Sequence, residues 1–236
     1  MLIPTPEVVF FDATGTLFEV RGGVGEIYGR VARDFGFESE PRTLQRNFAR
    51  SFREQPALAF PSGTPDAELA GLEKDWWRNL VEAVFADLGP FPRFDEFFDE
   101  IFERFRGREF WRVYDDVEPA LAGLKQQGFR LGVISNFDSR LYDALRACDL
   151  DRFFDSVHIS TRVGAAKPDP AIFQAALGHY RIDPSQACHV GDSLREDVAG
   201  ARAAGLHAFL IDRPGEQNSE AGYASLSSLF ELLEML

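Results

Sequence analysis

Short apolar runs that alternate with helical segments are the feature that most constrains the fold of this chain. Residues Val8–Phe11 (VVFF) form such a run, and a strand without a polar position is typical of a sheet buried on both faces. Further strands are expected at 131–134, 157–159, 187–190 and 208–211, and helices at 117–127, 139–147, 171–177, 195–204 and 225–235. This alternation predicts an α/β fold with a doubly wound, parallel, Rossmann-like sheet.

The segment between the first strand and the later ones has a helical pattern. Apolar residues recur at helical spacing at 24–35, 44–52, 69–88 and 94–105, and no strand is expected between about residues 18 and 112. Thr64 and Pro65 fit the N-cap and first residue of the third helix. Because the first strand needs the later ones to complete a sheet, we predict two units. A helical bundle, or cap, is inserted at residues 18–114, and residues 1–17 and 115–236 form one α/β core.

Composition excludes several classes of function. The net charge of -13, from 38 acidic and 25 basic residues, argues against a protein that binds the nucleic-acid backbone. The two cysteines, Cys148 and Cys188, fit neither a disulfide framework nor a zinc site. Met1–Thr5 lacks the basic region of a signal peptide, and no apolar run approaches the roughly 18 residues of a membrane span. We therefore expect a cytoplasmic protein without a membrane partner; the sequence does not specify its oligomeric state.

Polar residues follow four of the predicted strands. In chain order they are Asp12, then Ser135 and Asn136, then Lys167, then Asp192 and Asp197. Because parallel strands place their carboxyl ends at one edge of the sheet, these side chains are expected to converge there. Each of them alone is an ordinary turn or capping residue, but a suitable group after each of four strands is hard to obtain by chance.

The residue types in this set suit phosphoryl chemistry. Two nearby carboxylates, such as Asp12 and Asp192, repel each other unless a cation lies between them, and oxygen ligands favour Mg²⁺. A carboxylate can also be a covalent nucleophile. Lys167 would neutralise both that nucleophile and an incoming anion, and Ser135 with nearby backbone N–H groups could hold phosphoryl oxygens.

These segments resemble the four motifs of the haloacid dehalogenase-like superfamily. Residues 11–17 (FDATGTL) resemble the first motif, 133–136 (VISN) the second, 167–170 (KPDP) the third and 191–197 (GDSLRED) the fourth. The insertion after the first motif resembles the helical cap of one subgroup. The resemblance covers the whole α/β part and only the position and helical character of the cap. Its motifs are specific for the superfamily and weakly specific for the substrate.

The resemblance implies a role for each residue. Asp12 would be the nucleophile and a Mg²⁺ ligand, with the Thr14 backbone carbonyl and the Asp192 carboxylate as further ligands, while Asp197 would steady a metal-bound water. The residues implied to hold the phosphorylated substrate are Gly15, Thr16, Ser135, Asn136 and Lys167. The implied reaction is hydrolysis of a small phosphorylated metabolite through an aspartyl intermediate, with Asp12, Ser135 and Lys167 as catalytic residues and a cap that closes to exclude water.

One position departs from the family pattern and leaves alternatives open. Phosphatases of this family usually carry a second Asp two residues after the nucleophile, as general acid and base; here it is Thr14. Losing that help can slow turnover roughly a hundred- to ten-thousand-fold. The favoured interpretation is a slow phosphatase, or one restricted to good leaving groups such as acyl or aryl phosphates.

Three other functions stay open. A 2-haloacid dehalogenase needs no proton for its leaving halide, but such enzymes work without metal and do not keep the acids that stand here as Asp192 and Asp197. A phosphonatase needs a cap lysine, for which Lys74 is the only candidate, on a charged helix face. A protein that binds phosphoryl groups or partners without turnover is the fourth interpretation.

Overall fold

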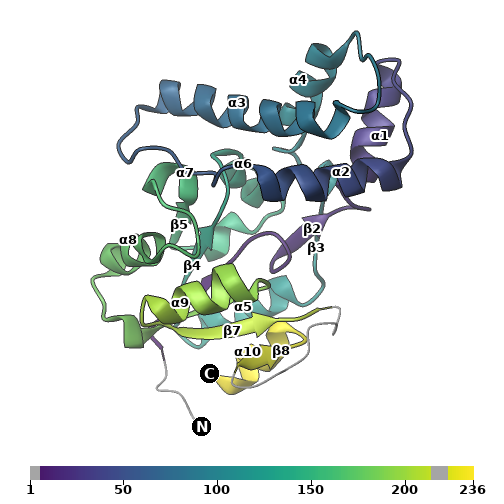
Figure 1. Ribbon diagram of the computed structural model, residues 1–236. Helices are drawn as coiled ribbons and strands as arrows, with labels where there is room; N and C mark the ends of the chain where they lie inside the picture. Colours follow the sequence, from purple (N-terminus) through teal and green to yellow (C-terminus); the bar gives the residue numbers. More distant parts are fainter. Residues whose placement is uncertain (1–5, 214–222) are drawn as a thin grey trace.

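A parallel six-stranded sheet forms the centre of the computed structural model, which describes residues 6–213 and 223–236 (Figure 1). The order across the sheet is β5-β4-β1-β6-β7-β8, and every neighbouring pair is parallel. The strands are β1 (Val8–Phe11), β4 (Arg130–Ser135), β5 (Ser156–Ile159), β6 (Ala187–Gly191), β7 (His207–Ile211) and β8 (Ala224–Leu226). The predicted α/β, Rossmann-like class is therefore confirmed. The segment Met1–Thr5, used above to argue against a signal peptide, lies outside the described residues.

Helices cover both faces of this sheet, which explains why β1 carries no polar residue. Val9 and Phe11 pack in one apolar core and Val8 and Phe10 in another, because successive strand residues point to opposite faces. The first core includes α5 (Val117–Gln126), α6 (Arg140–Ala147) and α10 (Leu229–Met235). The second includes α8 (Pro170–Tyr180) and α9 (Gly200–Ala203), and the short α7 (Ser160–Val163) follows β5. All four residues of β1 are fully buried.

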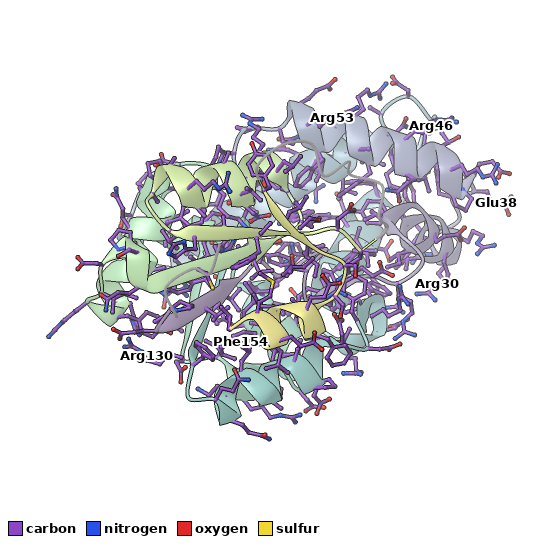
Figure 2. The ribbon with its side chains drawn as sticks, turned by 90° about the horizontal axis from the view of Figure 1, so that it is seen from below. Arg30, Glu38, Arg46, Arg53, Arg130 and Phe154 are labelled. Carbon is purple, nitrogen blue, oxygen red and sulfur yellow. The ribbon has the colours of Figure 1, made fainter. Side chains whose placement is uncertain are left out.

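Four helices form a cap on one side of the core (Figure 1). They are α1 (Val24–Asp34), α2 (Pro41–Glu54), α3 (Asp66–Phe85) and α4 (Phe94–Arg104). Their inward faces build an aromatic core in which the Phe97 ring lies 5.2 Å from Phe85 and 6.1 Å from Tyr28. Charged side chains such as Arg46 and Arg53 point outward (Figure 2). Packing therefore accounts for most of the aromatic stripe, as the helical spacing predicts.

Two strands occur where none was expected. β2 (Phe18–Val20) pairs antiparallel with β3 (Trp111–Val113), so the prediction of a segment 18–112 without strands was wrong. Each strand has only three residues, too few for a period of two to be visible in the sequence. The pair forms because the two chain segments that connect the cap with the core run side by side. The Phe18 and Trp111 rings contact each other there at 4.8 Å.

Two predicted helix starts were also wrong. The helix expected at 225–235 begins at Leu229, because Ser225 lies in β8 and the Ser228 side chain accepts a hydrogen bond from the Phe230 N–H as the N-cap. The third cap helix begins at Asp66 with Pro65 as N-cap. The Thr64 hydroxyl donates instead to the Pro61 carbonyl. Within 6–213 and 223–236, no helix combines the length and apolar composition that a membrane crossing requires.

Cap helix α3 is fastened to the core by a buried carboxylate. Glu73 is 3% exposed, and its Oε1 accepts hydrogen bonds from the Ser139 N–H (3.0 Å), the Ser139 hydroxyl (2.9 Å) and the Thr161 hydroxyl (2.6 Å). Ser139 is the N-cap of α6, and Thr161 lies in α7. The glutamate therefore accepts hydrogen bonds from residues of two core helices, and its removal would leave three donors without their acceptor.

We expect Glu73→Ala to lower the free energy of unfolding by about 1–3 kcal/mol, because these donors become unsatisfied. Denaturation in urea, followed by circular dichroism, measures the change. Glu68→Ala on the same helix is the matched control, since Glu68 is exposed and its loss should have little effect. Equal effects of the two substitutions would contradict the role of Glu73.

Candidate active site

A buried lysine joins three of the four strand ends. The Lys167 Nζ donates to Asp12 Oδ1 (2.6 Å), to Asp197 Oδ1 (2.6 Å) and to the Ile134 carbonyl (3.0 Å). Lys167 is 4% exposed. Burial disfavours its charged form, but the two carboxylates outweigh this and hold the pKa of Lys167 above its usual range. The structure thus brings together the residues that the sequence places after β1, β4, β5 and β6.

Three carboxylates gather beside this lysine. Asp12, Asp192 and Asp197 each offer an oxygen atom, and these atoms all lie within 4.8 Å of one another. Burial and the charges of Asp12 and Asp197 raise the pKa of Asp192 to about 7. Burial also raises the pKa of Asp12, and Lys167 opposes that rise. One ammonium therefore does not balance three carboxylates, and an all-oxygen cluster of this kind fits a hard divalent cation.

Asp197 is held by three donors besides its place in the cluster. Its Oδ1 accepts from Lys167 and lies 2.8 Å from His189 Nε2, while its Oδ2 accepts from the Ser193 N–H (2.9 Å). Although burial opposes ionisation, the Lys167 charge and the His189 hydrogen bond keep the pKa of Asp197 below its usual range. The π-helical turn Leu194–Ala199 places the carboxylate there, one turn after β6. Asp197 therefore stays ionised and fixed in direction.

The Asn136 amide holds the backbone of the lysine loop. Its Oδ1 accepts from the Lys167 N–H (2.7 Å), and its Nδ2 donates to the Lys167 carbonyl (2.9 Å) and to Glu196 Oε2 (3.1 Å). This two-way bond fixes the point from which the ammonium extends. The sequence places Asn136 among the substrate ligands; the structure shows how its amide positions Lys167.

The remaining predicted residues occupy distinct places around Asp12. Ser135 is buried and its side chain helps to lower the pKa of Asp12, and Thr14 is exposed to the site. Gly15 has φ 85°, and a Cβ there would lie 2.2 Å from Asp192 Oδ2, so only glycine lets this carboxylate approach. Thr16 is fully buried, and its hydroxyl has no hydrogen-bond partner among the described residues.

A cavity of about 420 Å³ opens above Asp12, between core and cap. Its floor includes Asp12, Thr14, Ser135, Lys167 and Asp192. Its walls are mainly rings, from Tyr28, Phe48, Phe52, Trp77, Phe98, Phe102, Phe105, Trp111 and Phe137. The helical pattern alone does not identify which cap residues face the site; the structure supplies them.

The sequence reasoning missed an ion pair on the cavity wall. Arg140 is 4% exposed and donates to both carboxylate oxygens of Asp138 (2.9 and 2.6 Å) and to the Phe102 carbonyl (3.2 Å). Its guanidinium lies 4.0 Å from the Phe102 ring centroid and 4.8 Å from that of Trp77. The Trp77 indole N–H donates to the same Asp138. The signal was an acid and a base two residues apart, directly after Ser135 and Asn136.

Comparisons with known proteins agree with this arrangement. A family model described as haloacid dehalogenase-like hydrolase matches residues 6–205. The chain is 36% identical to the mouse (Mus musculus) haloacid dehalogenase-like hydrolase domain-containing protein 3, over 85% of this chain and 80% of that protein. It is 30% identical to a phosphoserine phosphatase of Thermus thermophilus, over 88% and 89%. A magnesium-bound crystal structure of the Bacillus subtilis hydrolase YfnB shares the fold, with a TM-score of 0.76, 18% identity and 99% of both chains covered.

The raised pKa of Asp192 gives a pH dependence with a definite sign. In metal-free protein the folded state binds a proton on Asp192 up to a pH of about 7, whereas the unfolded state releases it near its ordinary value of 3.8. Proton binding to Asp192 therefore favours the folded state at low pH. This contribution to the free energy of unfolding is lost as the pH rises from about 4 through 7. Asp192→Asn removes the charge, so we expect it to stabilise the protein in EDTA by about 1–4 kcal/mol at pH 8.

Thermal melts of both proteins in EDTA at pH 5 and pH 8 measure the effect. The difference should be large at pH 8 and small at pH 5, where the native Asp192 is already protonated. Asp151→Asn, at an exposed position, is the control and should change neither melt. A pH-independent effect of Asp192→Asn would contradict the electrostatic explanation.

Proposed function

The chain belongs to the haloacid dehalogenase-like hydrolases, and on that premise we propose that it is a magnesium-dependent phosphatase of a small phosphorylated metabolite. The observation that carries the proposal is the Asp12–Lys167 ion pair at 2.6 Å inside a cluster of three carboxylates. The family uses a divalent metal in general, the Thermus relative is a phosphoserine phosphatase, and the Bacillus hydrolase binds magnesium. These likenesses support the substrate class and the metal.

In the proposed reaction the Asp12 carboxylate attacks phosphorus as the bond from phosphorus to the leaving oxygen breaks, and the leaving group departs as an anion that takes its proton from solvent. Water then cleaves the aspartyl-phosphate, which restores Asp12 and releases phosphate. Lys167 balances the charge of the nucleophile and of the phosphoryl oxygens, and the Ser135 hydroxyl, beside Asp12, can donate to one of those oxygens. The residues proposed to hold the substrate remain Gly15, Thr16, Ser135, Asn136 and Lys167.

The proposed metal ligands are Asp12, Asp192 and the backbone carbonyl of Thr14. Magnesium bound there supplies positive charge that offsets the carboxylates and the phosphoryl group. Asp197 already accepts three protein hydrogen bonds, which suits it to orient a bound water rather than to move. The cap, for which we retain residues 18–114 as proposed bounds, excludes bulk water when it is seated.

The structure gives reasons to rank the alternatives below phosphatase. A metal-free dehalogenase would not need the carboxylate of Asp192 beside Asp12, although such chemistry would tolerate Thr14. Lys74, the candidate for the cap lysine that a phosphonatase needs, is not among the residues that line the cavity. It pairs with Asp99 (2.7 Å), and its side chain is 44% exposed. A binding protein without turnover would retain the metal site and show no phosphate release.

Asp12→Asn is expected to abolish hydrolysis of p-nitrophenyl phosphate and acetyl phosphate, because the amide is a poor nucleophile and a weaker ligand. Phosphate release in magnesium, and again in EDTA, measures both requirements. Wild-type activity should need the metal and fall at least roughly a thousandfold with Asp12→Asn. Activity that survives either change would contradict the proposed mechanism. No activity in the wild type would direct the search to halide release from 2-chloropropionate.

Thr14→Asp is expected to speed hydrolysis of an alkyl phosphate such as glycerol 3-phosphate. The new carboxyl can protonate the leaving alkoxide, a help of roughly a hundredfold or more. The matched control is Thr14→Asn, which has a similar size and no acid. An equal rate for all three proteins would show that the missing acid does not limit turnover.

A further inference from the structure

We infer that the cavity selects a substrate whose leaving group carries an aromatic ring and no charge other than that of the oxygen that leaves. This inference rests on the proposed phosphatase function and adds the chemical class of the group beyond the phosphate. The reactive carboxylate of Asp12 lies on the cavity floor, so a phosphate bound there directs the rest of the substrate toward the cap. What the cap offers to that part of the substrate therefore decides which compounds are accepted.

The cap side of the cavity offers rings and aliphatic groups. Phe48, Phe52, Trp77, Phe98 and Phe102 line it together with aliphatic residues such as Val81. An apolar cavity of about 150 Å³ is large enough for a benzene ring. The roughly 420 Å³ available here, shared with the phosphate, accommodates an aromatic group. Ring-to-ring packing in such walls favours an aromatic over an aliphatic group of similar area.

The Arg140 guanidinium and the indole N–H groups of Trp77 and Trp111 are already engaged within the protein. Each nitrogen of the Arg140 guanidinium donates to Asp138 or to the Phe102 carbonyl. The indole N–H of Trp77 donates to Asp138, and that of Trp111 donates to the Phe105 carbonyl at 2.9 Å. A leaving group with a further charged substituent, such as an amino acid, would lose the hydration of that charge between these rings, where Arg140 and Asp138 already pair with each other, at a cost of several kcal/mol.

Tyr28 adds a polar contact to the walls without adding charge. It is 2% exposed to solvent and lines the cavity. Burial raises the pKa of Tyr28, so the hydroxyl stays neutral. It can therefore serve one neutral polar substituent on a ring.

A residue on the floor of the cavity, Thr14, favours the same class of substrate for a separate chemical reason. Thr14 cannot protonate a leaving alkoxide, so an efficient substrate must release an anion that is stable without a proton. Phenolates and aromatic carboxylates meet that condition, and simple alkoxides do not. The chemistry at Thr14 and the shape of the cap thus select overlapping sets of compounds.

The test compares benzoyl phosphate with acetyl phosphate, in magnesium, on the whole protein. Both are acyl phosphates that leave as carboxylates, so they differ mainly in the ring. We expect kcat/KM to be roughly ten- to a hundredfold higher for benzoyl phosphate, with Asp12→Asn as the background for spontaneous hydrolysis. Equal values would overturn the inference and leave the proposed phosphatase intact. Hydrolysis of neither compound would overturn the proposed function itself.

Two variants test whether the cap walls cause the preference. Val81→Trp fills the cavity and should lower kcat/KM for benzoyl phosphate more than for acetyl phosphate, which removes the advantage of the ring. If that variant does not fold, Phe52→Ala serves instead, since Phe52 lines the cavity but is 45% exposed. It should reduce the preference several-fold, whereas Phe230→Ala, at a 46% exposed ring outside the cavity lining, should not. A preference unchanged in Val81→Trp or Phe52→Ala would overturn the inference.

Discussion

The ammonium of Lys167 is the contact on which the rest of the site depends. It joins carboxylates that follow β1 and β6 and a carbonyl of β4, so one cation ties together three neighbouring strands. Removal of one partner of a buried ion pair destabilises the folded protein by about 3–5 kcal/mol, because the remaining charge is left buried without a partner and away from water. Here two carboxylates share the same partner. The Asn136 amide fixes the backbone of Lys167, so the point from which the ammonium extends is set by the protein alone.

The strand ends were predictable from the sequence because burial on both faces leaves a clear pattern. Val8–Phe11 and the 131–134 segment are short apolar runs, each followed directly by a polar residue, and parallel strands bring such ends together by topology alone. The convergence of Asp12, Lys167 and Asp192 followed from chain order without any knowledge of distances. Family motifs then supplied the roles that proximity could not.

Other features depended on contacts that a single sequence does not encode. The β2–β3 pair joins residues more than ninety positions apart, and each strand is shorter than any periodic signal. The function of Asn136 became visible only when its amide was seen to contact both the N–H and the carbonyl of Lys167. The orientation of each cap helix depends on packing among many rings, so Trp77 and Phe102 could not be assigned to the cavity from spacing.

Helix α3 carries both Glu73, which bonds the cap to the core, and Trp77, which lines the cavity. The two residues lie four positions apart on one face of the helix. The position of the cap on the core and the shape of the cavity therefore both depend on this helix. A mutation there that changes substrate choice also changes how firmly the cap sits. Helix α2, which contributes Phe48 and Phe52 to the walls, does not share these bonds to Ser139 and Thr161, whereas α4 is bonded to the core through the Phe102 carbonyl and Arg140. New specificities would thus arise at lower risk to stability from α2, with α3 retained as the helix that fastens the cap to the core.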